Sequence, residues 1–456
     1  MRKILLHLII LTYSVKGQAL SERELVDSVL NHFPLIEESV MKYKSADAEL
    51  TAAEGAFDHK LSFKSRNRIE DKYDNQYFET TIERQTPFYG LGLIAGHRQG
   101  RGTFPPYDGK YETSAMGEVF AGLSLPLLRN FSTDEGRTNL AIAQIEKKQA
   151  QAQIHLKKNI YIHKSLSLYY KWLLENQKLK IRKEILTIAL DRHSMLEKKF
   201  KAGDIERLKL NDNQRSIDKR RDEIIKSEID IARLRAELSL YLRDQEGNPI
   251  SVKEAAYPDE GLIAESHKFS PIELTGVPQF SILELEKNKL NSLKELYSQS
   301  QLPGLAVEVL GARELSGNAA YDPDSLQLGL KFDYPLENRK ARGKTVSSEY
   351  KLKAIQKESE YLAQELTRMF NFSVEAMYAS KKRWDVISSE LKNALTMGSA
   401  EVKRWNQGAS DLFIVYLREQ EVAETNIRRW TALYEYLQYS LDAKLYSGTL
   451  LKTYQN

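Results

Sequence analysis

Cysteine is absent from the 456 residues of this sequence. Disulfide bonds, thiolate metal sites and cysteine nucleophiles are therefore excluded. An excess of charge of one sign is also missing, because 67 Lys and Arg residues stand against 63 Asp and Glu residues. Such a balance does not favour nucleic acid as a partner.

Catalytic signatures are missing as well. The sequence contains no phosphate-binding P-loop, no G-x-S-x-G and no H-E-x-x-H. Its eight histidines form no ligand set, and the pair His155 and His163 is expected to be solvated or packed. We therefore expect no enzyme, no bound metal and no cofactor.

Long apolar runs are lacking except near the N-terminus. There Arg2 and Lys3 precede the stretch ILLHLIILTYSV, and small residues follow it. This pattern is typical of a secretory signal peptide, which we place at residues 1–19; a buried N-terminal helix is the alternative. No later segment is long and apolar enough to be a membrane-spanning helix. We expect an exported chain that is either soluble or a β-barrel.

Four long stretches contain no proline and are predicted to be helices. A helix of about 60 residues is about 90 Å long, which exceeds the usual globular length and indicates a coiled coil. The second stretch supports this, because Leu210, Ile217, Ile224, Ile231 and Leu238 recur every seven residues. The predicted helices cover residues 137–200, 205–242, 340–404 and 411–446.

Period-two alternation of apolar and polar residues predicts two pairs of strands. The four segments are KLSFKSRNRI, EVFAGLSLP, LAVEVL and LQLGLKFDYP, and the second strand of each pair ends in proline. The segment YGLGLIAGHRQGRGTFPPYDGKY lies between the first two and is rich in Gly, Pro and Tyr. It indicates a long loop or an extra hairpin.

The chain repeats this order of elements. Each half has a helix, a strand pair, a proline, a long helix, a glycine turn and a second long helix. We therefore predict a mainly α fold with a small β part and duplicated helical hairpins. The predicted divisions are a signal peptide (1–19), a first repeat (20–246), a linker (247–276) and a second repeat (277–456).

Four strands are too few to close a barrel, because single-chain outer-membrane barrels begin at eight strands. An open apolar sheet leaves unpaired edges, which lipid does not tolerate. Several copies that pool their strands would remove these edges. We therefore expect an oligomer.

This duplicated layout resembles the TolC-like outer-membrane efflux proteins, or outer membrane factors. The resemblance lies in the strand-to-helix junctions LPLLRNFSTDEGRTNLAIAQIE and YPLENRKARGKTVSSEYKLKA, and in the two glycine turns, Phe200–Gly203 and Trp405–Gly408. It implies a homotrimer in which each protomer gives four strands to a twelve-stranded barrel. The barrel would sit in outer-membrane lipid, and the helices would form a hollow α-barrel across the periplasm.

The resemblance also implies a function and partners. The protein would be a passive exit duct of a tripartite efflux or type I secretion system. A periplasmic adaptor would link it to an inner-membrane pump of the RND or ABC type, which supplies the energy. The tips of the helical hairpins would meet the adaptor, and the residues implied there are Phe200, Gly203, Asp204, Trp405, Gly408 and Ala409.

The same resemblance places a gate just after the second tip. Characterised relatives have acidic side chains there, whereas this sequence has Ile414 and Leu417 at the corresponding positions. Closure by apolar contact is therefore our expectation, with Asp411 and Glu419 as the acidic alternatives.

The first strand predicts part of a pore wall. Lys64, Arg66 and Arg68 alternate with apolar residues, so we expect the basic side chains to face the lumen, since charge on a lipid face is costly. An exported coiled-coil scaffold of the cell envelope is the alternative function. It accounts for the heptads but not for a signal peptide together with paired amphipathic strands.

Overall fold

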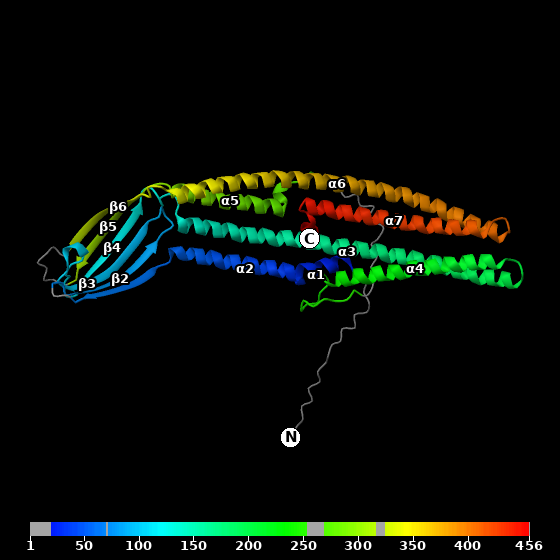
Figure 1. Cartoon of the computed structure of the whole chain (residues 1–456), viewed down its shortest axis with the longest axis horizontal. Helices are drawn as coiled ribbons and strands as arrows, with labels where there is room; N and C mark the ends of the chain where they lie inside the picture. Colours follow the sequence, from blue (N-terminus) through cyan, green and yellow to red (C-terminus); the bar gives the residue numbers. More distant parts are fainter. Residues whose placement is uncertain (1–19, 70–71, 253–268, 316–323, 456) are drawn as a thin grey trace, which may run out of the picture. The chain divides into compact units, whose positions relative to one another are not determined.

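The computed structural model of the chain describes residues 20–69, 72–252, 269–315 and 324–455 (Figure 1). The predicted signal peptide lies outside these residues, as does the middle of the predicted linker, residues 253–268. The rest of the chain is mainly helical with one antiparallel sheet, as the sequence predicted.

Two pairs of long helices dominate the chain. The first helix of each pair has 67 or 68 residues, and each of the four lies within a few residues of its predicted bounds. Two shorter helices begin at prolines, Pro34 and Pro278. The helices are α1 (Glu22–His32), α2 (Pro34–Glu54), α3 (Glu135–Lys201), α4 (Arg207–Ser239), α5 (Pro278–Gln299), α6 (Arg339–Asn406), α7 (Leu412–Tyr446) and α8 (Leu450–Gln455).

None of the helices in the described part of the chain combines the length and the apolar composition needed to cross a membrane.

The sheet has six strands, so the expectation of four strands per chain is wrong. The strands pair in sequence order, each antiparallel to the next. Four of them are the predicted strands. A fifth, Gly92–Gly102, lies in the Gly-rich segment, for which an extra hairpin was one of two interpretations, and the sixth, Asn75–Gln85, precedes that segment and was not predicted. The strands are β1 (Lys60–Arg68), β2 (Asn75–Gln85), β3 (Gly92–Gly102), β4 (Glu118–Pro126), β5 (Gly304–Glu314) and β6 (Asp324–Asp333).

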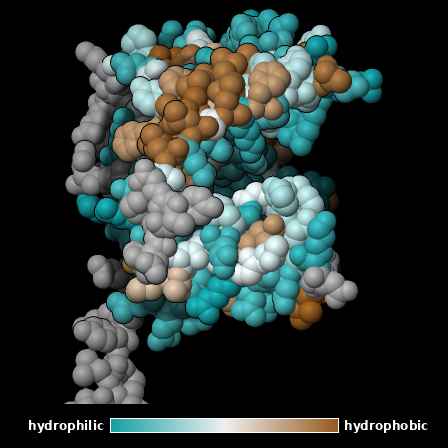
Figure 2. Space-filling model, turned by 90° about the vertical axis from the view of Figure 1, so that its left-hand side faces the viewer, coloured by the Kyte–Doolittle hydropathy of each residue, from teal (hydrophilic) through white to brown (hydrophobic). Residues whose placement is uncertain are grey.

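The register gives the sheet one apolar and one polar face. Partner residues on antiparallel strands share a face, and Leu61 is the partner of Ile82, as Val309 is of Leu328. The apolar face is exposed, most clearly on β1 and β6. Its most exposed members are Leu61, Phe63, Leu326, Leu328, Leu330 and Phe332. Figure 2 views the sheet, and hydrophobic side chains gather at the top of this view, where β5 and β6 lie in Figure 1.

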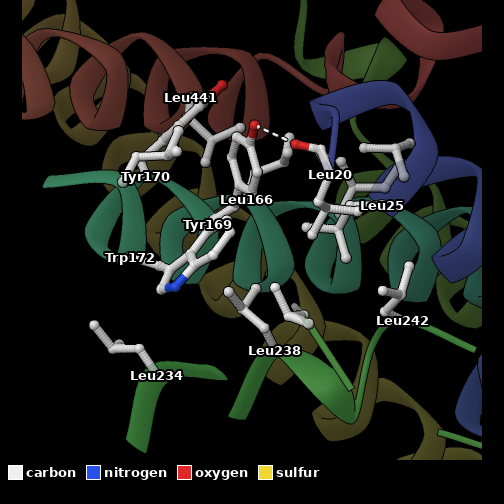
Figure 3. Close-up of a cluster of buried hydrophobic side chains, with 14 of the residues drawn as sticks. Leu20, Leu25, Leu166, Tyr169, Tyr170, Trp172, Leu234, Leu238, Leu242 and Leu441 are labelled. Atoms are coloured by element: carbon white, nitrogen blue, oxygen red, sulfur yellow. Dashed lines mark hydrogen bonds between the residues drawn. The ribbon is translucent and has the colours of Figure 1, made fainter. Parts of the chain in front are cut away.

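Helix-on-helix packing provides the main hydrophobic core. The heptad residues of α4 from Ile217 to Leu238 are buried, which confirms the predicted seam. Two of them, Ile231 and Leu238, belong to a cluster with Tyr169 and Trp172 of α3 and Leu441 of α7 (Figure 3). The Tyr169 hydroxyl donates a hydrogen bond of 3.0 Å to the carbonyl oxygen of Leu20, so the start of the described chain is fixed to this core.

The chain forms two compact units. One contains the glycine turns and the core just described, and it comprises Met1–Glu38, Ile154–Pro278 and Ala363–Asn456. The other contains the whole sheet and comprises Ser39–Gln153 and Gln279–Leu362.

Candidate functional site

The two glycine turns have the same backbone structure. Gly203 and Gly408 have φ values of +82° and +74°, in the left-handed region that glycine adopts without penalty. The amide of each glycine donates to the carbonyl of the aromatic residue three positions earlier, Phe200 or Trp405, at 3.0 Å. The next amide donates to the carbonyl five residues back at 2.9 Å in both turns. These two bonds define a Schellman C-cap, so each turn ends one long helix and allows the next to begin.

The predicted tip residues lie together at these turns. Asp204 and Ala409 follow the two glycines and are exposed, and the Phe200 side chain is exposed as well. Trp405 is half-buried, and the ammonium group of Lys199 lies 4.8 Å from its ring centroid. Since Lys199 belongs to α3, this cation–π contact joins the two turns.

Three of the four gate candidates are exposed at the start of α7. Asp411 caps the helix, because its carboxylate accepts a hydrogen bond of 2.8 Å from the Phe413 amide. The same carboxylate lies 3.9 Å from the ammonium group of Lys209. The side chains of Ile414 and Leu417 are 41% and 46% exposed. An apolar surface is therefore available at the positions that the family resemblance indicated.

Glu419 has a different environment from the other three. Its carboxylate forms an ion pair with Arg192 of α3, whose guanidinium is almost completely buried. A second buried guanidinium, that of Arg220 in α4, lies 5.1 Å from the Tyr416 ring. Burial lowers the pKa of Arg220, and the nearby Tyr416 and Glu419 oppose this shift. No pattern in the sequence predicts this cluster, because single arginines are common in a charged coiled coil.

The predicted pore-lining residues share the polar face of the sheet. Lys64, Arg66 and Arg68 lie on the face of β1 opposite to the exposed side chains of Leu61 and Phe63. Lys64 begins a row of charged residues at one level across five strands, because each is the register partner of the next. The row runs Lys64, Glu79, Arg98, Glu118 and Glu314.

Glu118, one residue of this row, is buried, and it forms polar contacts with Arg98 and Tyr111. The guanidinium of Arg98 forms an ion pair with the carboxylate of Glu118, which is only 3% exposed. The hydroxyl of Tyr111 donates to the same carboxylate at 2.8 Å and accepts a hydrogen bond of 2.8 Å from Arg98. Sequence reasoning missed this network, which joins two strands and a loop.

Within the residues that the structure describes, no group of three His, Asp or Glu side chains is arranged to hold a metal ion.

Comparison with known proteins identifies the fold. No family model matches the sequence, and no curated protein matches it. Solved structures do match. The CusC channel is 12% identical, with a TM-score of 0.66 and coverage of 95% of both chains. The outer membrane protein VceC from Vibrio cholerae is 11% identical, with a TM-score of 0.66 and coverage of 94% of this chain and 96% of that one.

The CmeC outer membrane channel from Campylobacter jejuni is 10% identical, with a TM-score of 0.65 and coverage of 96% of this chain and 90% of that one. At such identities the likeness concerns the fold, and it extends over nearly the whole chain. The chain therefore has the fold of the outer membrane factor channels, as the layout of its sequence predicted.

Proposed function

We propose that the protein is the outer-membrane exit duct of an efflux or secretion system. It conducts cargo passively across the periplasm and the outer membrane. The energy comes from an inner-membrane pump of the RND or ABC type, which a periplasmic adaptor links to the hairpin tips. The similarity to solved outer membrane channels supports this proposal at the level of fold.

The sheet is the observation that carries the proposal. Its apolar face is exposed, and its edge strands β1 and β6 each pair with one neighbour only in the described residues. The backbone N–H and C=O groups along such edges can form hydrogen bonds with a strand of another chain. Pairing β1 of one copy with β6 of the next would satisfy both edges and would leave a closed barrel with an apolar outside and a polar lumen.

Because each chain has six strands instead of four, the barrel that we expect three copies to form has more strands and a larger diameter. Three copies of a six-stranded sheet would give eighteen strands rather than twelve, which lies within the range of known outer-membrane barrels. Barrel diameter grows roughly in proportion to strand number. The proposed lumen is therefore wider than that of a twelve-stranded barrel.

The mass of the protein in detergent tests this proposal. The full chain should be recovered from the outer-membrane fraction as a trimer that migrates differently before and after heating. A stable monomer with a folded β signature would contradict the closed barrel. A water-soluble oligomer in the periplasm would favour the alternative function, a coiled-coil scaffold of the cell envelope.

A further inference from the structure

One long segment of the sheet unit belongs neither to the long helices nor to a strand. It is the loop Thr103–Gly117, which joins β3 to β4 at the end of the sheet away from α2 and α5 (Figure 1). Its ends are tied to the sheet. The Thr103 amide donates to the carbonyl of Asp74, and the Thr113 amide donates to the carbonyl of Gly100, both at 2.9 Å.

The middle of the loop crosses the polar face. A Cβ atom on Gly100 would point to this face and would lie 2.3 Å from the carbonyl oxygen of Tyr111. Only a glycine at this position lets the loop pass so close. Farther along, the ammonium group of Lys110 lies 3.6 Å from the ring centroid of Tyr77 on β2. The loop therefore reaches from β4 across β3 to β2.

Several side chains of the polar face are buried, as expected if the loop lies over them. Tyr77, Glu118 and Phe120 all belong to that face and are less than 8% exposed. Polar contacts fix the loop in place. The Tyr111 hydroxyl bridges Arg98 and Glu118, as described above, and the Ser114 amide donates a hydrogen bond of 2.8 Å to the carboxylate of Glu314.

We propose that the loop Thr103–Gly117, held across the polar face by Arg98, Tyr111 and Glu118, forms a constriction that restricts the exit to small solutes. The inference rests on the proposed function, in which the polar face lines the lumen. Eighteen strands would enclose an aqueous channel, and three inward loops would narrow it. An exit of this kind suits small molecules and excludes unfolded or folded polypeptides as cargo.

The test is polymer exclusion from single channels of the full chain in planar bilayers. Neutral polyethylene glycols of increasing size are added on the side that the loop faces. The size at which these polymers stop lowering the conductance gives the cut-off size of the opening that the loops form. In the main variant, a Gly-Ser linker of about four residues replaces residues 104–115. We expect this variant to admit larger polymers than the wild type admits.

A milder variant protects the test against misfolding of the linker variant. Tyr111→Phe removes only the hydroxyl that bridges Arg98 and Glu118, and we expect it to raise the cut-off size. Tyr89→Phe is the matched control, because it removes a hydroxyl from an exposed side chain in the turn between β2 and β3. This control should keep the wild-type cut-off.

Three outcomes overturn the inference. If the wild type forms channels and both loop variants keep its cut-off size, the loop is not a constriction and the proposed function stands. If only Tyr111→Phe folds and it keeps the wild-type cut-off, the constriction is likewise wrong. If the wild type and all variants form no channel, the proposed function fails and the inference fails with it.

Discussion

At the scale of single residues, two glycines define the ends of the helical hairpins. A Cβ atom placed on Gly203 or Gly408 would meet no atom within 4 Å. Glycine is therefore not required there for space. It is required for the positive φ, which costs other residues about 1–2 kcal/mol.

We predict that alanine has opposite effects on stability at two glycines, one in the turn that follows α6 and one inside α6. Gly408→Ala should destabilise the turn by about 1 kcal/mol, because alanine opposes the left-handed conformation. Gly343→Ala is the matched control. Gly343 lies inside α6, where an added Cβ atom would also meet no atom within 4 Å, so alanine should stabilise the helix by about 0.5–1 kcal/mol.

Hydrogen exchange of amides near each site measures both effects. Exchange at the turn should accelerate in Gly408→Ala and slow near Gly343 in the control. Equal slowing at both sites would show that the positive φ is not needed.

A second residue-scale prediction concerns the pair Arg192–Glu419. Replacing Glu419 with Leu leaves the buried Arg192 guanidinium without its carboxylate, which should cost about 3–5 kcal/mol. Replacing Arg192 with Met in addition should recover most of that loss, because two apolar side chains of similar size can pack in the same place.

Denaturant unfolding of the four proteins in this cycle gives the coupling energy. Additive losses would mean that the pair is not formed. A strong coupling would favour Glu419 as a packing residue between α3 and α7, which leaves Asp411, Ile414 and Leu417 as gate candidates.

The sequence revealed the turns but not this pair, for a physical reason. A Schellman turn depends on bonds within about six residues, so the spacing of Phe200 and Gly203 in the sequence is enough to predict it. Arg192 and Glu419 are far apart in the sequence. Their meeting depends on which faces of α3 and α7 pack together, and the heptads of a single helix do not determine this.

At the scale of elements, β1 offers a direct test of the two faces. Arg66→Glu should preserve assembly and shift the selectivity of the channel toward cations, because the residue lies on the polar face. Ser65→Arg introduces a charge at the neighbouring residue on the apolar face. It should reduce the yield of assembled protein, since an arginine at the membrane midplane costs about 2–4 kcal/mol.

Reversal potentials under a salt gradient and the trimer yield in detergent are the two measurements. If Ser65→Arg assembles normally and changes selectivity while Arg66→Glu does neither, the two faces are assigned the wrong way round.

The long helices were predictable from the sequence, whereas β2 was not predicted and β3 lay in a segment for which an extra hairpin was only one of two interpretations. Heptads such as Ile217 to Leu238 give a periodic signal over many turns. In β3 the signal is weak, because the polar-face positions Gly92, Gly96 and Gly100 are glycines. Gly100 lacks a side chain where Tyr111 crosses the strand. The missing side chain at Gly100 therefore has two consequences. It lets the loop pass close to β3, and it weakens the alternating pattern from which the strand could have been predicted.

At the scale of the whole molecule, closure of the proposed duct is a property of three copies. Opening at the tips would require packed helices to shift against their neighbours, and such interfaces usually switch between discrete arrangements. The exposed side chains of Ile414 and Leu417 on α7 predict that the closed state depends mainly on apolar contact. Such contact should depend little on salt, because salt screens charges rather than apolar surfaces.

Leu417→Asp tests this closure. It would place like charges around the symmetry axis of the proposed trimer, and their repulsion should favour the open state. Conductance in planar bilayers should therefore rise above that of the wild type at low salt. The increase should shrink at about 1 M salt, where the screening length falls to about 3 Å. Leu417→Asn is the matched control, because it removes the apolar side chain without adding charge. Its conductance should lack this salt dependence. If the wild type opens readily as salt is changed while Leu417→Asp conducts no better, then polar groups such as Asp411 hold the gate and apolar closure is wrong.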